Sequence, residues 1–303
     1  MIPRNAPPGD AATETERRPK IVMTLLVRDE EDILADNIEF HRAQGVDHFI
    51  VTDNLSKDAT PSIIARYARL GLATSILESD DDYDQAAWVT RMARMAAIEL
   101  GADWVINCDA DEFWLASAPG RSLKEYFRGI PADVDVVLGT RRDFACLDTE
   151  TGPWHQRMVY RKTVSLNHIG RPLPPKASHR AHPGVAVLQG NHKVWGLAGR
   201  EMNGDGLEIL HFPIRSQAQF ENKIRNGGAA YARNTKVPET VARGWRNLYR
   251  TYVAEGSLDS YLREECFDPE RLAAGLAAGE LVLDRRLADF GFSDATFRAG
   301  DRR

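Results

Sequence analysis

The chain has 303 residues, of which 43% are hydrophobic and 27% are charged, as in ordinary globular proteins. Its 39 lysines and arginines and 44 aspartates and glutamates give a formal net charge of −5, which argues against a protein whose main task is to hold a nucleic-acid backbone. The three cysteines are widely spaced and form no CxxC pair, which argues against a disulfide framework or a zinc ribbon and favours a reducing compartment.

The start of the chain carries no membrane or export signal that we recognise. Residues 1–19 combine Pro, Ala, Thr and mixed charge without an apolar stretch, so we predict a disordered lead-in and no secretory signal. No later stretch approaches the roughly 18 apolar residues that a membrane span needs. We therefore expect a cytoplasmic protein with no membrane span.

Strand and helix patterns alternate from residue 21 to residue 108. Apolar runs predict strands at 21–27, 46–52, 72–77 and 104–108, and helical patterns between them cover 30–44, 60–71 and 85–100. This alternation is typical of an α/β fold with a mostly parallel sheet and helices on both faces. Polar clusters at 28–30, 53–58 and 109–112 follow directly on three of the strands. Because ligands bind beyond the carboxyl ends of parallel strands, we expect the three clusters to meet at one crevice.

The pattern changes beyond residue 130. Strand-like runs at 134–140, 158–166, 185–189 and 207–212 are separated by loops containing Pro and His, which predicts a mixed-sheet second half. Ser216 and Gln219 form a capping-box pattern that opens a helix carrying Lys223 and Arg225, and two glycines at 227–228 end it. From residue 268 we predict a helical C-terminal tail.

The acidic cluster at the end of the fourth predicted strand is the strongest chemical feature. Asp109 and Asp111 project to the same side if the extended geometry continues, and two carboxylates at this spacing can hold a hard divalent cation together with phosphate oxygens. A DxD pattern is common, and an acidic turn that simply ends a buried strand is the alternative interpretation.

The segments VRDEEDIL, HRAQGVDHFIVTDNLSKDAT and ADWVINCDADEF occur in that order within residues 20–115. Together they resemble a family 2 type glycosyltransferase of the GT-A fold, close to the bacterial branch with a DADEF-type DxD motif. The resemblance implies a glycosyltransferase domain at 20–254, with a nucleotide-sugar-binding half at 20–115 and an acceptor-binding half at 116–254. A helical extension would follow at 255–303.

The resemblance also implies roles for single residues. One group of residues would bind a UDP- or GDP-sugar donor, and a second group would bind a Mn²⁺ or Mg²⁺ ion. One carboxylate would deprotonate the acceptor hydroxyl, and the transfer would invert the configuration of the anomeric carbon. The donor group is Val27, Arg28, Glu30, Asp53, Asn54, Arg91 and Asp109; the metal group is Asp109, Asp111 and His211; the base is Asp143. The acceptor would be a glycan, a lipid-linked molecule reached by peripheral membrane association, or a small molecule.

Several alternatives stay open on the sequence. His192 is a second candidate for the downstream metal ligand, and His211 is equally well explained as a structural histidine. Asp143 would have no catalytic role if it merely paired with Arg142. Two departures from the family pattern are Asp29 in place of Asn and Ala59 in place of Gly, and the second matters only if that position needs a positive φ.

Three aromatic side chains, those of Phe144, Trp154 and Trp195, are candidates for stacking on a sugar or for the core, and His179 with His182 makes a weak zinc candidate. Other functional classes are less well supported. A catalytically inactive GT-A scaffold that binds nucleotide-sugars or glycans is one alternative, and a nucleotidyltransferase is another, although the first strand is followed by an acidic segment without glycine. Neither a P-loop nor a GxGxxG pattern occurs in the sequence.

Overall fold

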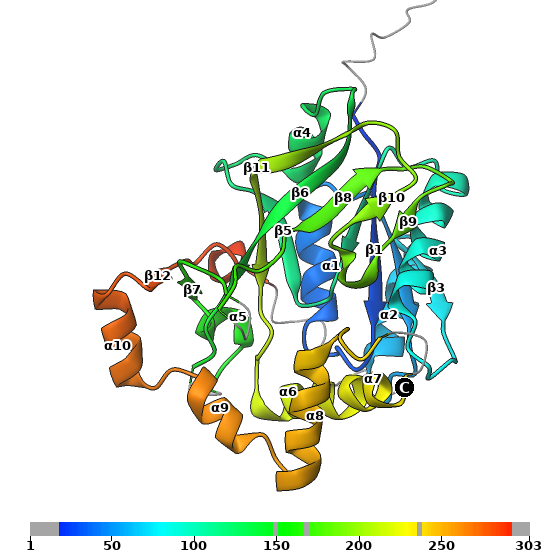
Figure 1. The fold of residues 1–303 in the computed structure, drawn as a ribbon. Coiled ribbons are helices and arrows are strands. Elements are labelled where there is room, and N and C mark those ends of the chain that lie inside the picture. Colours follow the sequence, from blue (N-terminus) through cyan, green and yellow to red (C-terminus); the bar gives the residue numbers. More distant parts are fainter. Residues whose placement is uncertain (1–17, 148–150, 167–169, 235–237, 293–303) are drawn as a thin grey trace, which may run out of the picture.

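The computed structural model describes residues 18–147, 151–166, 170–234 and 238–292. Over these residues the chain forms an eight-stranded sheet with the order β3-β2-β1-β4-β8-β6-β11-β5 (Figure 1). Two small two-stranded sheets, β10-β9 and β12-β7, lie beside it. The expected α/β fold, with a mostly parallel first half and a mixed second half, is confirmed. Residues 1–17, most of the predicted lead-in at 1–19, lie outside the described residues.

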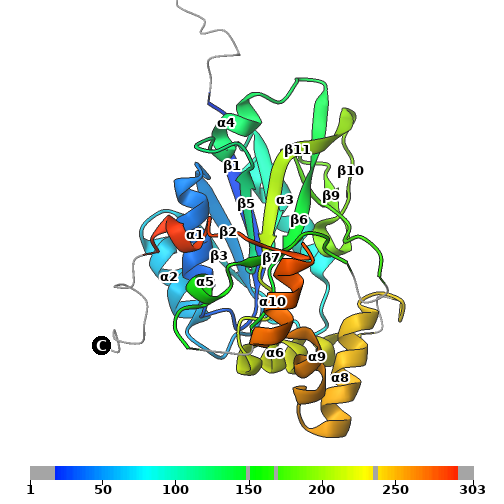
Figure 2. The same cartoon turned by 90° about the vertical axis from the view of Figure 1, so that its left-hand side faces the viewer.

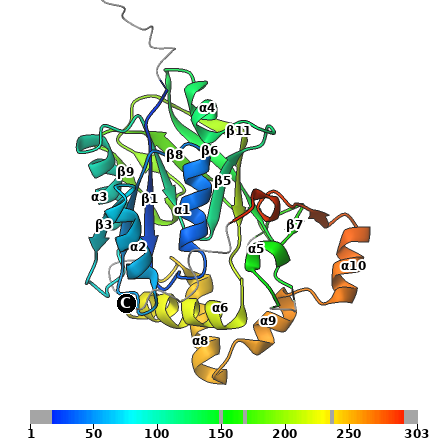
Figure 3. The same cartoon turned by 180° about the vertical axis from the view of Figure 1, so that it is seen from behind.

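The first half of the sheet is parallel and is covered on both faces. Its elements are β1 (Ile21–Val27), α1 (Leu34–Ala43), β2 (His48–Asp53), α2 (Thr60–Arg69), β3 (Ala73–Leu77), α3 (Gln85–Ile98) and β4 (Trp104–Cys108). Alternate residues of β1 enter two cores: Met23 packs with residues of α1 and α2, and Val22 packs with residues of α3. Figure 3 shows α1 and α2 on the face of the sheet that lies away from the viewer in Figure 1. Burial on both faces explains why β1, β2 and β4 are mostly apolar runs, whereas the edge strand β3 is exposed at alternate residues.

The second half of the sheet is mixed. Its elements are β5 (Glu112–Ala116), α4 (Leu123–Arg128), β6 (Val134–Asp143), β8 (Lys176–Arg180) and β11 (Arg200–His211). β8 runs antiparallel to both β4 and β6, whereas β11 is parallel to β6 and antiparallel to β5. The sequence did not indicate β5 or β8. The runs predicted at 158–166 and 185–189 form only short strands outside the main sheet, β7 (Tyr160–Lys162) and β9 (Ala186–Val187), which pair with β12 (Leu281–Leu283) and β10 (Val194–Trp195).

Helices cross the carboxyl ends of the parallel strands (Figures 1 and 2). They are α6 (Gln217–Lys223), the π-helical turn η2 (Ile224–Gly228), α7 (Ala229–Arg233) and α8 (Arg243–Glu255), and α8 was not predicted. The Ser216 side chain caps α6 by accepting from the Gln219 N–H, but the Gln219 side chain accepts from the Arg215 N–H, so only half of the predicted capping box forms.

The remaining elements are short. They are α5 (Trp154–Arg157), η1 (Gln189–Asn191), α9 (Asp259–Glu265), α10 (Pro269–Ala277) and η3 (Ala288–Phe290). The predicted helical tail begins as expected with α10. The prediction is wrong at residues 281–283, because the chain returns there as the strand β12 to pair with β7. The division of the chain at residue 254 stays a prediction. Within the described residues, no helix combines the length and the apolar character that crossing a bilayer requires.

Candidate active site

The loops that follow β1, β2 and β4 lie together at one edge of the sheet. The Asn54 N–H donates to the Val27 carbonyl at 2.9 Å, which joins the ends of β1 and β2. The Lys223 ammonium group lies against Asp111 and 3.5 Å from Glu30, which brings the loops after β1 and β4 to the same helix, α6. The structure therefore gathers the three polar clusters as the parallel-sheet rule predicts.

Asp29 connects the first of these loops to its neighbours. It has a φ of 55°, and its carboxylate accepts from the Lys57 N–H at 2.6 Å and from the Asn222 and Asn226 amides at 3.2 and 2.7 Å. A carboxylate offers only acceptors, so Asp suits this position with three donors. Ala59 has a φ of −78°, so the replacement of Gly there introduces no left-handed strain.

The turn that carries Asp109 and Asp111 is held from behind by α1. The Asn37 amide donates to the carbonyls of Ala110 and Glu112 at 2.9 and 2.8 Å. One turn later, His41 Nε2 accepts from the Trp114 N–H at 2.8 Å, while its Nδ1 faces oxygen atoms of Asn37. All these groups are buried. The Asn37–His41 pair thus fixes the backbone that presents the two aspartates.

Asp109 lies between a strand and a loop of the second half. Lys176 of β8 donates to its Oδ2 at 2.5 Å, and Asn191, which follows a left-handed glycine in η1, donates to its Oδ1 at 3.2 Å. Lys176 also lies 3.1 Å from Glu112, and only 2% of its side chain is exposed. Burial alone lowers the pKa of Lys176, but the two carboxylates outweigh burial and raise it above its ordinary value.

Asp111 is more deeply buried than Asp109 and has two cationic neighbours. The Lys223 ammonium group donates to its Oδ2, and His211 Nε2 lies 3.7 Å from the same oxygen. Burial acts to raise the pKa of Asp111, but Lys223 and His211 hold it well below its ordinary value. Arg215 completes this side of the site through ion pairs of 2.7 Å to Glu30 and to Asp32.

His211 and Asp143 form a second pair. Their Nδ1 and Oδ1 atoms are 2.7 Å apart. Burial lowers the pKa of His211, but Asp143 and Asp111 outweigh it and raise the value to about 9. The imidazolium in turn holds the pKa of Asp143 below its ordinary value, against the effect of burial. The alternative that Asp143 pairs with Arg142 is wrong, because Arg142 contacts Glu208 at 2.9 Å.

The carboxylate oxygens of the predicted metal ligands are of the type that a hard cation prefers, but cationic side chains surround them. Asp109 and Asp111 each already contact a lysine ammonium group. Both ring nitrogens of His211 face carboxylates, with Nδ1 at 2.7 Å from Asp143 and Nε2 at 3.7 Å from Asp111. Among the described residues, no group of three or more acidic, histidine or cysteine side chains is arranged to hold a metal ion. This arrangement does not fit a cation bound by all three residues.

The predicted nucleotide-binding residues lie around the ends of β1 to β3. Asp53 is buried and accepts from the Ser56 N–H at 3.3 Å, and the Asn54 amide donates to the Glu78 and Asp80 carbonyls at 3.2 and 2.8 Å. The two predicted arginines lie in the same region. Arg28 pairs with Asp81 at 2.7 Å, and Arg91 pairs with Glu78 at 2.9 Å. Glu30 faces Arg215 and Lys223 and so belongs to the acidic centre.

Other candidates from the sequence lie elsewhere. Phe144 and Trp154 are buried and pack around Phe212, so they are core residues, whereas Trp195 is exposed on β10. His192 Nδ1 contacts the Pro175 carbonyl at 2.8 Å. His179 contacts the Arg180 carbonyl, and His182 accepts from the Gly184 N–H. Within the part of the chain that the structure describes, they form no metal cluster.

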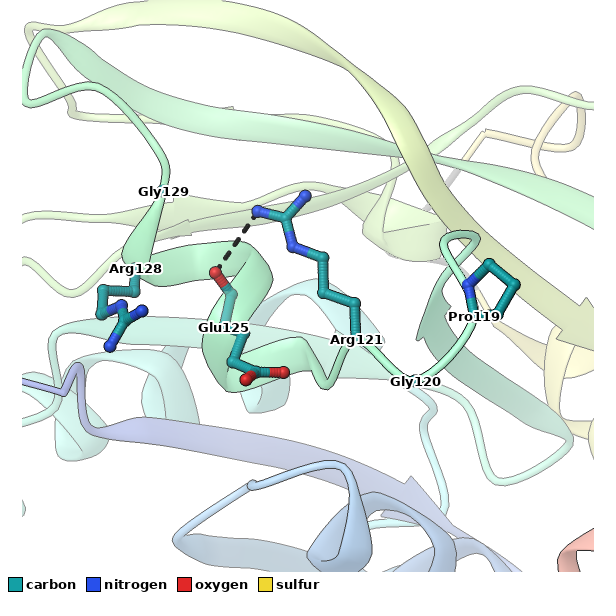
Figure 4. Close-up of a pocket in the computed structure, with 6 residues that line it drawn as sticks. All are labelled: Pro119, Gly120, Arg121, Glu125, Arg128 and Gly129. Carbon is teal, nitrogen blue, oxygen red and sulfur yellow. Dashed lines mark hydrogen bonds between the residues drawn. The ribbon is translucent and has the colours of Figure 1, made fainter.

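Among the surface hollows of the described structure, two lie at opposite ends of the sheet. One, of about 520 Å³, borders the site and is lined by Asp29, Lys57, Asp58, Asn222, Arg225 and Asn226. The other lies around α4, at the opposite end of the sheet from α6 (Figures 1 and 4). Figure 4 shows Arg121 reaching back to the Glu125 carbonyl there. Only the first hollow is placed to receive part of a ligand of the site.

Four residues of the site had little or no signal in the sequence. Lys176 follows a Pro-rich segment and begins a strand without an apolar run, and Asn191 lies in a loop. Asn37 and His41 share one helix face at a spacing of four residues, a pattern that fits an ordinary buried face as well. Lys223 did have a signal, because it stands on the capped helix that follows His211.

Comparison with known proteins identifies the class. Residues 22–138, from β1 into β6, match the sequence model of glycosyltransferase family 92. This family differs from the family 2 assignment, which stays a prediction. No curated protein sequence matches the chain. The matched span identifies a glycosyltransferase.

Solved structures of two proteins are similar in part. Residues 1–349 of TarS from S. aureus, in complex with UDP, share 12% identity over 82% of this chain and 75% of that chain, with a TM-score of 0.40. Glucosyl-3-phosphoglycerate synthase from Mycobacterium tuberculosis, in complex with Mn²⁺, UDP and glucosyl-3-phosphoglycerate, shares 18% identity over 42% of this chain and 46% of that chain, with a TM-score of 0.30. At these values neither structure assigns a ligand to this chain.

Proposed function

We propose that this protein moves a sugar from a nucleoside-diphosphate donor, a UDP- or GDP-sugar, to an acceptor hydroxyl, with inversion at the anomeric carbon. The observation that carries the proposal is the meeting of the polar loops after β1, β2 and β4 within the span that matches a glycosyltransferase family. The resemblance to family 2 type enzymes supports inversion as the stereochemical outcome.

The nucleoside would bind at the ends of β1 to β3. Asn54 is buried, and its amide nitrogen is engaged by two carbonyls, whereas its Oδ1 has no hydrogen-bond partner in the described structure. A buried acceptor without a partner is costly unless a ligand meets it, so Asn54 Oδ1 is our proposed contact for a donor group of the base. Asp53, Arg28 and Arg91 would complete the donor site around it.

The acceptor hydroxyl must lose its proton during the transfer. Asp143 is our proposed base, since the imidazolium of His211 keeps its carboxylate ionised at neutral pH and holds it in place. The acceptor oxygen bonds to the anomeric carbon as the bond to the diphosphate breaks, and the proton goes to Asp143. A glycan, a lipid-linked molecule or a small molecule would serve as the acceptor.

A Mn²⁺ or Mg²⁺ ion at Asp109, Asp111 and His211 stays a prediction of the sequence. When bound to a diphosphate, such an ion neutralises the charge that develops on the leaving group. Because two lysines and an imidazolium occupy the surroundings of these aspartates, we route no step of the transfer through a metal.

Release of nucleoside diphosphate from a panel of UDP- and GDP-sugars tests the function. The panel is run with glycan, lipid-linked and small-molecule acceptors in Mn²⁺, Mg²⁺ or EDTA. We expect release from one donor, and we expect Asp143→Asn to lower kcat by about 100-fold or more with donor affinity unchanged. Asp133→Asn is the matched control, since this aspartate precedes the same strand and pairs with Arg200 at its far end. Nucleotide binding without release from any donor would support an inactive scaffold instead.

A further inference from the structure

Two lysines from the second half of the chain meet the two aspartates of the DxD pattern. Lys176 comes from β8 and contacts Asp109, and Lys223 comes from the end of α6 and contacts Asp111. Neither lysine is near its aspartate in the sequence, as 67 and 112 residues separate the partners. The fold therefore brings an ammonium group to each carboxylate that the sequence assigned to a divalent cation.

The whole acidic centre is matched with positive charge in the same way. Glu112 lies 3.1 Å from Lys176, and Glu30 lies 2.7 Å from Arg215 and 3.5 Å from Lys223. A cluster of buried carboxylates attracts a dication when it lacks counter-charges, and here each has a lysine or arginine within 3.5 Å. The cations needed to stabilise a diphosphate are thus already part of the chain.

The two lysines differ in their freedom to move. Only 2% of the Lys176 side chain is exposed, and it is fixed between two carboxylates on a central strand. By contrast, 21% of the Lys223 side chain is exposed. Its ammonium group lies 5.9 Å from the centre of the Trp245 ring, and the 520 Å³ hollow opens along the same helix. Lys223 is the lysine that can turn from Asp111 towards a ligand while it remains near Glu30.

We propose that the Lys223 ammonium group binds the donor diphosphate and stabilises the departing nucleoside diphosphate, in the role that the sequence assigned to a divalent cation. This proposal rests on the proposed function. As the bond between the anomeric carbon and the β-phosphate oxygen breaks, its electron pair stays on that oxygen, and Lys223 donates a hydrogen bond to the phosphate without losing its proton. Preorganised positive charge at this point lowers the barrier, as a metal ion does elsewhere. Lys176 meanwhile keeps Asp109 and Glu112 in place.

Calorimetric titration of the full chain with UDP and with GDP, in EDTA and in Mn²⁺, tests the proposal. We expect the wild-type protein to bind one of them in EDTA within about threefold of its affinity in Mn²⁺. Lys223→Met should weaken this binding by about tenfold or more, because it removes a charge-assisted hydrogen bond to the diphosphate. Lys124→Met is the matched control, because Lys124 also pairs with one aspartate, Asp47, and is also 21% exposed, but lies at α4. It should leave the affinity unchanged.

A second pair of variants separates binding from folding. Lys223→Met removes the closer of the two cationic neighbours of Asp111 and leaves His211. The double variant with Asp111→Asn removes the lysine–aspartate pair together and should still show the tenfold loss. Asp111→Asn alone frees Lys223 and should keep or tighten binding in EDTA. Nucleotide binding that requires Mn²⁺ and ignores Lys223→Met would overturn the proposal and leave the proposed function standing. Absence of binding to either nucleotide in both conditions would overturn the two together.

Discussion

The buried histidine behind the 109–112 turn makes the stability of the protein sensitive to acid. His41 Nε2 accepts from the Trp114 N–H, so a proton on this nitrogen would break that bond and place a charge in the core. Burial accordingly lowers the pKa of His41 from 6.5 to about 3, against a smaller opposing effect of the Asn37 carbonyl. In the unfolded chain the same side chain titrates near its ordinary value.

The sign and size of the effect follow from this difference in pKa. Between pH 6.5 and pH 3 the unfolded chain binds a proton at His41 that the folded chain refuses, so stability falls as the pH falls through this window. At pH 5 the loss from this one group amounts to about 2 kcal/mol relative to pH 8. That is a large part of the 5–15 kcal/mol typical of folded domains.

Urea unfolding at pH 8 and pH 5 measures the effect in the wild-type protein and in His41→Gln. Glutamine keeps an acceptor for the Trp114 N–H but does not titrate, so the variant should lose about 2 kcal/mol less between the two pH values. His182→Gln, in an exposed loop, controls for the substitution itself. Equal losses in the wild type and His41→Gln would refute the reasoning, as would an NMR titration of His41 with a midpoint near 6.5.

Three further substitutions test the packing around the site, each by urea unfolding. Asn37→Ala removes the donor to two buried carbonyls of the 109–112 turn and should lower stability by about 2–4 kcal/mol, and an effect below about 0.5 would contradict its role. Arg215→Met removes the guanidinium group that pairs with Asp32 and the closer of the two cationic partners of Glu30, so it should lower stability by about 3–5 kcal/mol at pH 7 but less at pH 4. Gly227→Ala places a methyl group 2.6 Å from the Trp245 ring and should lower stability by about 1–3 kcal/mol; an unchanged midpoint would show that α8 shifts freely.

The first half of the fold is readable from the sequence because its strands are buried on both faces. The runs at 21–27 and 104–108 coincide with β1 and β4, and the glycines after α1 and α2 end those helices. Strand β8 escaped prediction for a physical reason. Its sequence Lys-Ala-Ser-His-Arg contains no apolar run, yet Lys176 and Ser178 are buried because Asp109 and the Val137 carbonyl, far away in the chain, satisfy them.

The acidic part of the site was likewise predictable, whereas its electrostatics were not. A DxD pattern after a strand indicates where carboxylates gather, since the strand fixes their place locally. The side chains that contact these carboxylates come from distant parts of the chain. Whether those side chains are cationic decides whether the carboxylates are available to a metal ion. Lys176 has no local pattern, and the side chain of His211 is an imidazolium only because Asp143 and Asp111 lie on both sides of it.

The matched span and the rest of the chain contribute opposite charges to the centre. Glu30, Asp109, Asp111 and Glu112 all lie within residues 22–138, whereas the cationic groups that contact them come from residues 176 to 223. In a fragment ending near residue 138, these four carboxylates would therefore lack the cationic groups that contact them, and their negative charge would repel the phosphates of a donor. Substitutions confined to the C-terminal portion would change the counter-ions while the carboxylates stay constant, so they offer a direct route to altering which ions the site binds.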